Sequence, residues 1–227
     1  MKILIVLTSH DQLGNTGKKT GFWLEDFITP YYVLKDAGVE IALASPKGGQ
    51  APIDPISDLP ENCTLSTKRF HSDPAAQAEL ANTKELTQVS AEDFDAAFYP
   101  GGHGPMWDMP DNTASIALIE AFDKASKPIV AVCHAPIALV NVRGKECDYM
   151  VRGKHVTGFS NEEEDAVGLS EILPFLLEDG LRERGAVYSK TDNWAPYVQV
   201  DGHLITGQNP ASAGPAAAAL LQLLRST

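Results

Sequence analysis

Short runs of apolar, β-branched residues alternate along the chain with longer segments whose apolar residues recur at helical spacing. The longest early helical segment covers residues 22–38 and stops at Gly38. Pro30 lies inside it and predicts a kink or a break. The apolar runs are typical of buried parallel strands. In the first half of the chain they cover residues 2–8, 39–46, 94–102 and 128–134.

The same alternation continues to the end of the chain. Residues 47–90 are the exception, because they are rich in proline and contain one clear helical segment, at 74–85. Further strands are predicted at 154–160, 186–190, 197–202 and 204–207, and further helices at 112–126, from 136 onward and at 212–226. Strands that alternate with helices predict an α/β fold, a doubly wound and mostly parallel sheet with helices on both faces. No linker interrupts the pattern, so residues 1–227 are expected to form one domain.

Charge and composition narrow the function classes. The 227 residues carry a formal net charge of −12, which removes the main electrostatic term for binding nucleic acid or an anionic membrane. The opening apolar run, residues 3–7, is too short for a signal-peptide core, and no segment is long enough to span a membrane. We therefore expect a soluble, cytoplasmic protein. Its three widely spaced cysteines do not predict a disulfide framework or a zinc ribbon.

One predicted strand ends in two reactive side chains. The sequence IVAVCHAPIALV places Cys133 and His134 where a core strand would continue with apolar residues. Ala131 and Ala135 flank the cysteine at two residues on either side, and small neighbours suit a nucleophile on a sharp strand-to-helix turn. The N-terminus of a following helix would favour the thiolate. We predict that Cys133 is a nucleophile, whereas Cys63 and Cys147 show no such setting.

Four motifs together resemble one protein family. They are FWLEDF, YPGGHGPMWD, AVCHAP and TGQNPASA, and the likeness extends from Lys2 to Ala219. The chain resembles the DJ-one/PfpI superfamily, and within it the heat-shock-protein-31-like branch, described as glutathione-independent glyoxalase III. The resemblance implies a flavodoxin-like fold, also found in class I glutamine amidotransferases, and a homodimer. The larger chaperone relatives carry an extra N-terminal domain and a metal site, which this sequence does not indicate.

The resemblance also implies a set of catalytic residues. It places a glutamate of the first long helix, matched here by Glu25, beside Cys133, where an apolar surrounding would raise its pKa. Its neighbour Asp26 is expected to be solvated. The family's histidine follows the cysteine, as His134 does, and a carboxylate about thirty residues on orients it. Counting along NEEED gives Glu164 for that acid, with Glu163 and Asp165 as alternatives; the other acids of the run are expected to be solvated.

Two glycines and a further histidine complete the predicted site. Gly101 and Gly102 follow a predicted strand, and the family uses this turn as half of its oxyanion site. His103 is either a substrate contact or an ordinary loop residue. The remaining histidines show no spacing typical of a metal site, so no metal is expected. The resemblance implies that no organic cofactor is needed.

The function implied by the resemblance is conversion of methylglyoxal and related 2-oxoaldehydes to 2-hydroxy acids through a Cys133 hemithioacetal. Removal of early glycation adducts, an activity also credited to relatives, shares that intermediate. One alternative is a stress-response holdase chaperone or a redox sensor in which Cys133 is oxidised. Another is a cysteine peptidase or amidase, and glutamine amidotransfer is disfavoured because its histidine lies far from its cysteine. A flavodoxin-like binding domain without catalysis is the last alternative.

Overall fold

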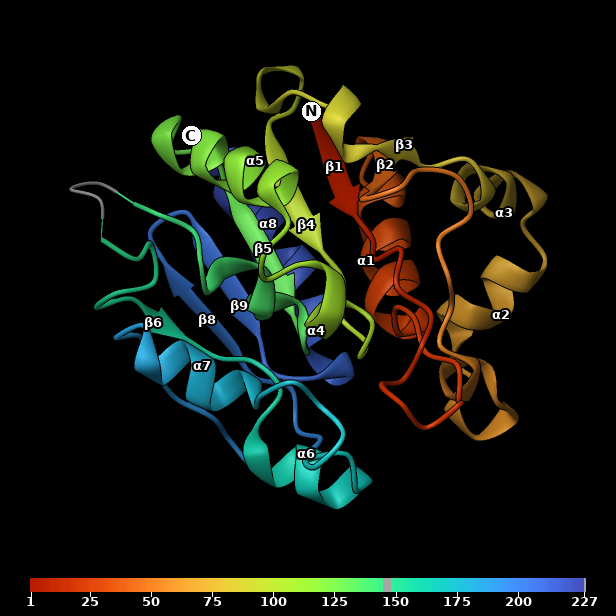
Figure 1. Ribbon diagram of the computed structural model, residues 1–227. Coiled ribbons are helices and arrows are strands. Elements are labelled where there is room, and N and C mark those ends of the chain that lie inside the picture. Colours follow the sequence, from red (N-terminus) through yellow and green to blue (C-terminus); the bar gives the residue numbers. More distant parts are fainter. Residues whose placement is uncertain (145–147, 227) are drawn as a thin grey trace.

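The computed structural model describes residues 1–144 and 148–226, and a seven-stranded sheet runs through its centre (Figure 1). The strand order is β3-β2-β1-β4-β5-β9-β8. Every neighbouring pair is parallel except β8 and β9, so the prediction of a mostly parallel sheet is confirmed. The strands are β1 (Lys2–Val6), β2 (Glu40–Ser45), β3 (Lys84–Glu85), β4 (Ala96–Tyr99), β5 (Ile129–Val132), β8 (Val198–Asp201) and β9 (Leu204–Gly207).

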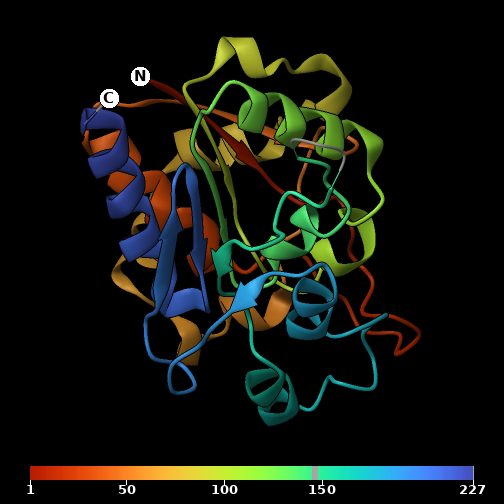
Figure 2. The ribbon, with the colours of Figure 1, turned by 90° about the vertical axis from the view of Figure 1, so that its left-hand side faces the viewer.

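Helices cover both faces of this sheet. Figure 2 shows α1 (Leu24–Asp36) and α8 (Ala213–Ser226) together on one side, and α5 (Thr113–Lys124) on the other. Side chains of a strand alternate between faces. Within β1, Ile3 and Ile5 therefore join the core beneath α1 and α8, while Leu4 and Val6 join the core on the α5 face. This arrangement is the predicted α/β fold with two buried layers.

The sequence pattern did not predict several shorter helices. They are α2 (Leu65–His71), α4 (Pro105–Asp108), α6 (Asn161–Val167) and α7 (Leu177–Glu183). Helix α2 lies in the segment expected to be loop and begins with reciprocal hydrogen bonds between Thr64 and Thr67. The predicted helix 74–85 is shorter, because α3 (Pro74–Ala81) gives way to β3. The helix expected from residue 136 is a 3₁₀ turn, Ala135–Leu139.

Two predicted strands are reduced to two residues each, and of the kink or break predicted at Pro30 the break does not occur. Residues 154–160 and 186–190 contribute only β6 (His155–Val156) and β7 (Val187–Tyr188), which pair with each other outside the main sheet. Helix α1 continues through Pro30. No helix within the described residues is long and apolar enough to cross a membrane.

Candidate active site

The turn after β5 holds Cys133 in a strained backbone conformation. Its φ of 58° lies in the left-handed region, which residues with a side chain rarely adopt. Two backbone hydrogen bonds hold the turn: the Cys133 amide donates to Gly207 O at 2.9 Å, and its carbonyl accepts from Phe159 N at 2.8 Å. The thiol therefore stands at the carboxyl end of the sheet, the edge at which parallel α/β sheets bind ligands.

The glycine turn after the neighbouring strand β4 packs directly against this cysteine. A Cβ on Gly101 would lie 2.5 Å from both Cys133 Cβ and Val132 O, and one on Gly102 would lie 2.3 Å from Trp23 N. Gly102 also has a φ of 101°, so both positions exclude any larger residue. The Gly102 amide faces the Cys133 sulfur and favours its ionised form. The turn predicted from the sequence therefore lies at the cysteine.

The imidazole of His134 lies between the thiol and a buried carboxylate. Its Nδ1 is 3.3 Å from Cys133 Sγ, and its Nε2 is 2.6 Å from Glu164 Oε2. A carboxylate only accepts hydrogen bonds, so Nε2 carries the proton and Nδ1 presents its lone pair to the sulfur. Burial lowers the pKa of His134, aided by the nearby His103, and this keeps the ring neutral near pH 7 although Glu164 opposes the shift.

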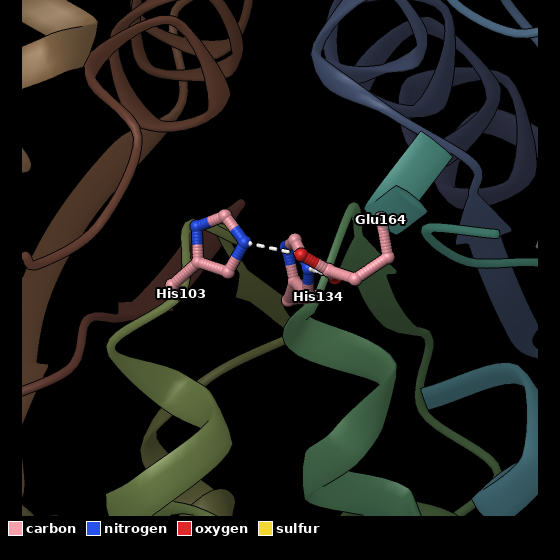
Figure 3. A group of neighbouring side chains, drawn as sticks. All are labelled: His103, His134 and Glu164. Carbon is pink, nitrogen blue, oxygen red and sulfur yellow. Dashed lines mark hydrogen bonds and ion pairs between the residues drawn. The ribbon is translucent and has the colours of Figure 1, made fainter. Parts of the chain in front are cut away.

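Glu164 lies in the first turn of α6 and contacts two histidines (Figure 3). Its Oε1 lies 2.9 Å from His103 Nε2, and the two imidazole rings are 4.2 Å apart. Burial opposes ionisation of this carboxylate, but the His134 and His103 rings outweigh it and its pKa is lowered. Glu164 is therefore the acid in contact with His134, and Asp165 is exposed.

The same three side chains could also hold a metal ion. His103, His134 and Glu164 each offer a donor atom, and these atoms lie within 4.8 Å of one another. Two imidazoles and one carboxylate suit a divalent transition metal. The linear spacing of these residues gives no sign of the grouping. The same side chains also hydrogen-bond to one another.

The carboxyl group beside the cysteine belongs to Asp26, and the prediction of Glu25 for this place is corrected. A Cβ on Gly101 would meet Asp26 Oδ2 at 2.8 Å on the same side as Cys133 Cβ. The expectation that Asp26 is solvated is also wrong, because its side chain is completely buried. Glu25 is half-buried and accepts hydrogen bonds from the hydroxyls of Thr29 and Thr64. One residue corresponds to 100° around a helix, so only one of the two neighbours can face the thiol.

Burial controls the protonation of both Asp26 and Cys133. Neither oxygen of Asp26 has a hydrogen bond of ordinary geometry, although the Cys133 thiol and the Gly101 amide lie near it. Burial raises its pKa to about 8, the charge of Glu25 adds to the shift, and these two neighbouring groups oppose it. Burial, together with Asp26, also raises the pKa of the Cys133 thiol. Cys133 is therefore a protonated thiol with the base His134 beside it, and not the helix-stabilised thiolate expected from the sequence.

These groups open into a cavity of about 620 Å³. Cys133, His134, His103 and Gly102 lie on its wall. The rest of the wall is mainly apolar and includes three aromatic side chains that the sequence analysis did not single out: Trp23, Phe159 and Trp194. Phe159 stands next to His134, with ring centroids 4.2 Å apart. Sequence alone offers no periodic signal for such a wall, because its members come from separate loops.

Three further sets of residues were noted in the sequence: the other acids of the NEEED run, the other two cysteines, and Asn209 of the fourth motif. Glu163, expected to be solvated if Glu164 is the functional acid, is completely buried; Glu162 is exposed. Cys63 is an exposed free thiol, and Cys147 lies outside the described residues. Asn209, from the fourth motif, is buried and donates hydrogen bonds to Glu163 Oε1 and to Ala195 O, both at 2.8 Å.

The chain is similar to known proteins over most of its length. The sequence model of the DJ-1/PfpI family matches residues 19–223. "Glyoxalase 3" of Candida albicans is 30% identical over 94% of both chains, and "Glutathione-independent glyoxalase HSP31" of Saccharomyces cerevisiae is 28% identical over 99% of this chain and 98% of its own. The crystal structure of Candida albicans glyoxalase III superposes with a TM-score of 0.91 at 27% identity, covering 98% of this chain and 97% of its own. Rapid Encystment Protein 24 KDa of Francisella tularensis gives 0.94 at 40% identity over 98% of both chains.

Proposed function

Since the chain belongs to the DJ-1/PfpI family, we propose that it is a glutathione-independent glyoxalase that converts methylglyoxal and related 2-oxoaldehydes to 2-hydroxy acids. The observation that carries the proposal is the row of contacts from Cys133 through His134 to Glu164, of which Cys133 and His134 lie on the wall of one cavity. Full-length relatives named as glyoxalases support it. We further propose that the protein is cytoplasmic, that each chain forms a single domain, and that no organic cofactor is needed. We also propose that two chains form a homodimer, and light scattering of the purified protein tests this.

The reaction begins at the sulfur of Cys133. As Sγ attacks the aldehyde carbon C1, its proton passes to His134 Nδ1, and Glu164 stabilises the resulting imidazolium. The amides of Gly102 and His134 are the proposed donors to the oxygen that becomes negative. His134 then returns the proton to this oxygen, which gives a neutral hemithioacetal and restores the base. A protonated thiol suffices for this step, because the proton leaves during the attack.

Two proton carriers then move hydrogen from C1 to C2. His134 removes the C1 proton while Asp26, which holds a proton near neutral pH, gives its own to the C2 oxygen; the product is an enediol. His134 next delivers its proton to C2, and Asp26 takes one from the C1 hydroxyl. This leaves a thioester on Cys133. Water cleaves the C–S bond, adding hydroxyl to C1 and hydrogen to sulfur, and the 2-hydroxy acid departs.

The burial of Cys133 disfavours the alternative of a redox sensor. Sensor cysteines are accessible and ionised, whereas this residue is 3% exposed and its thiol pKa is raised by burial. The hydrogen-bonded base beside it suits a nucleophile that is deprotonated only during reaction.

The experiment that tests the proposal is D-lactate formation from methylglyoxal without glutathione. The wild type is expected to turn over, and Cys133→Ser to lose at least about a thousand-fold in kcat. Cys63→Ser provides the matched control, because it removes an exposed thiol of the same cavity whose contacts are with Thr64 and Thr67 rather than with His134. Absence of D-lactate with folded, reduced wild type would overturn the glyoxalase assignment, and retained activity in Cys133→Ser would overturn the mechanism.

A further inference from the structure

The catalytic cavity is much larger than methylglyoxal requires. Its volume of about 620 Å³ lies within the range that accommodates drug-sized ligands, whereas methylglyoxal has only a methyl group beyond its two carbonyls. The surplus space adjoins a row of aromatic rings. Phe159 lies between His134 and Trp194, with ring centroids 4.2 Å from the first and 5.8 Å from the second. An aromatic surface thus leads from the reacting imidazole toward solvent.

Trp194 lies at this surface, and its backbone is in a strained conformation. Its side chain is 49% exposed, unusual for so large an apolar group, and its φ of 66° is in the left-handed region. The Trp194 amide donates to Glu163 Oε1 at 2.9 Å. Strained backbone of this kind persists only where the surroundings impose it, and it concentrates at ligand-binding sites.

Glu163 links the tryptophan to the rest of the site. Its Oε1 also accepts from Asn209, another residue of the cavity wall, and its Oε2 accepts from the Ser160 amide and hydroxyl at 3.0 and 3.1 Å. The next residue along α6 is Glu164, which orients His134. A completely buried carboxylate that accepts four hydrogen bonds from three residues fixes the position of the cavity wall relative to the catalytic histidine.

The charged side chains that line the cavity limit which substrate groups it can bind. Glu25 and Glu61 are the charged side chains that line the cavity within the described residues, besides its histidines, and no lysine or arginine accompanies them. A carboxylate or phosphate on the substrate would therefore lack a cationic partner. An uncharged aromatic or branched apolar group would instead pack against Phe159 and Trp194, where such contacts contribute most of the binding energy.

We propose that Trp194, positioned by Glu163, is a specificity-determining residue that selects 2-oxoaldehydes with an uncharged aromatic or bulky apolar substituent. This inference rests on the proposed glyoxalase function and names the substrate class of the same site. The reacting C1–C2 unit would lie against Cys133 and His134, and the substituent against Phe159 and Trp194.

Steady-state kinetics with phenylglyoxal and methylglyoxal test the inference. In the wild type, kcat/KM for phenylglyoxal is expected to exceed that for methylglyoxal by about ten-fold or more. Trp194→Ala should reduce the ratio by about ten-fold, mainly through KM for phenylglyoxal. Glu163→Gln should shift the ratio in the same direction by a smaller factor. Phe175→Ala is the matched control, because Phe175 is an exposed aromatic residue (39%) outside the cavity, and it should leave the ratio unchanged.

The possible outcomes separate this inference from the function on which it rests. Turnover of both aldehydes with methylglyoxal preferred, or a ratio unaffected by Trp194→Ala, overturns the specificity inference and leaves the glyoxalase function intact. Turnover of neither overturns both. Trp194→Leu, checked for folding by circular dichroism, replaces the alanine variant if that protein does not fold, and the same loss of selectivity is expected of it.

Discussion

Asp26 and Glu164 are two buried carboxyl groups on opposite sides of the same Cys–His pair, yet their pKa values move in opposite directions. Asp26 faces a thiol and the glycine turn, finds no hydrogen bond of ordinary geometry, and its pKa rises through burial to about 8. Burial acts on Glu164 too, but two imidazoles hydrogen-bond to it and its pKa falls. The comparison shows that the partners of a buried acid decide its protonation.

The difference in pKa suits the two acids to different catalytic roles. A carboxyl group that keeps its proton near pH 7 can donate it to a substrate oxygen. One that stays ionised can fix the tautomer of a histidine and stabilise its charged form, without exchanging protons itself. Three predictions test this division, beginning with the largest effect.

Replacing the ionised acid should have the greatest consequence for activity. In Glu164→Gln the side chain keeps its shape but no longer compensates the imidazolium of His134 or dictates its tautomer. We expect kcat to fall by about three to four orders of magnitude. Asp165→Asn is the matched control, because it changes the exposed neighbouring acid and should retain activity. Equal losses in the two variants would show that the charge of α6, rather than contact with His134, matters.

Replacing the protonated acid should have a smaller effect. Asp26→Asn removes a proton donor but leaves the thiol and its base, so kcat should fall by about a hundred-fold. The neighbouring substitution Glu25→Gln should cost less than Asp26→Asn, because the Glu25 carboxylate lines the cavity but is bound by the hydroxyls of Thr29 and Thr64. A larger loss for Glu25→Gln would reverse the assignment of the two residues, and D-lactate formation is the measurement.

The third prediction concerns stability. Since the pKa of Asp26 rises from 3.8 to about 8 on folding, the native state binds a proton that the unfolded chain releases between these values. The Asp26 contribution to the free energy of unfolding is therefore greatest at low pH, declines as pH rises from about 4 to about 8, and levels off above. Relative to the wild type, Asp26→Asn should gain on the order of 1 kcal/mol per pH unit across this window.

Urea unfolding at pH 5.5, 7.0 and 8.5 measures this gain. As pH rises across the series, the free energy of unfolding of Asp26→Asn should approach that of the wild type or exceed it. A constant difference across the series would mean that Asp26 titrates normally in the folded protein, and the proposed role as proton donor would lose its physical basis.

The sequence predicted the sheet and the position of Cys133 at a strand end better than it predicted the places of the carboxyl groups. Strands β4 and β5 are continuous apolar runs, and their ends locate the Gly101 turn and Cys133. The resemblance then located His134 and Glu164. Glu25 and Asp26 could not be told apart, because apolar residues flank both and the rotation of a helix about its axis depends on packing. One available signal was the i, i+4 relation of Glu25 to Thr29, whose hydroxyl it binds.

Helix α6 and the Trp194 loop could not be predicted for a different reason. Four consecutive acids lack apolar periodicity, so Glu163 and Glu164 gave no sign of being buried. Their burial is stabilised by specific hydrogen bonds with partners that are distant in sequence, such as Trp194 and Asn209. Patterns of hydrophobicity do not report contacts of this kind.

The site draws its parts from segments that are far apart along the chain: α1, the turns after β4 and β5, and the start of α6. Its contacts are therefore almost all non-local, and such contacts form late because each must first close a long loop. Asp26 comes to lie beside Cys133 only when the sheet and its covering helices are already assembled. During refolding, recovery of catalytic activity should consequently lag behind recovery of helical circular dichroism, and a truncated chain that lacks α6 should fold part of the sheet without acquiring a working centre.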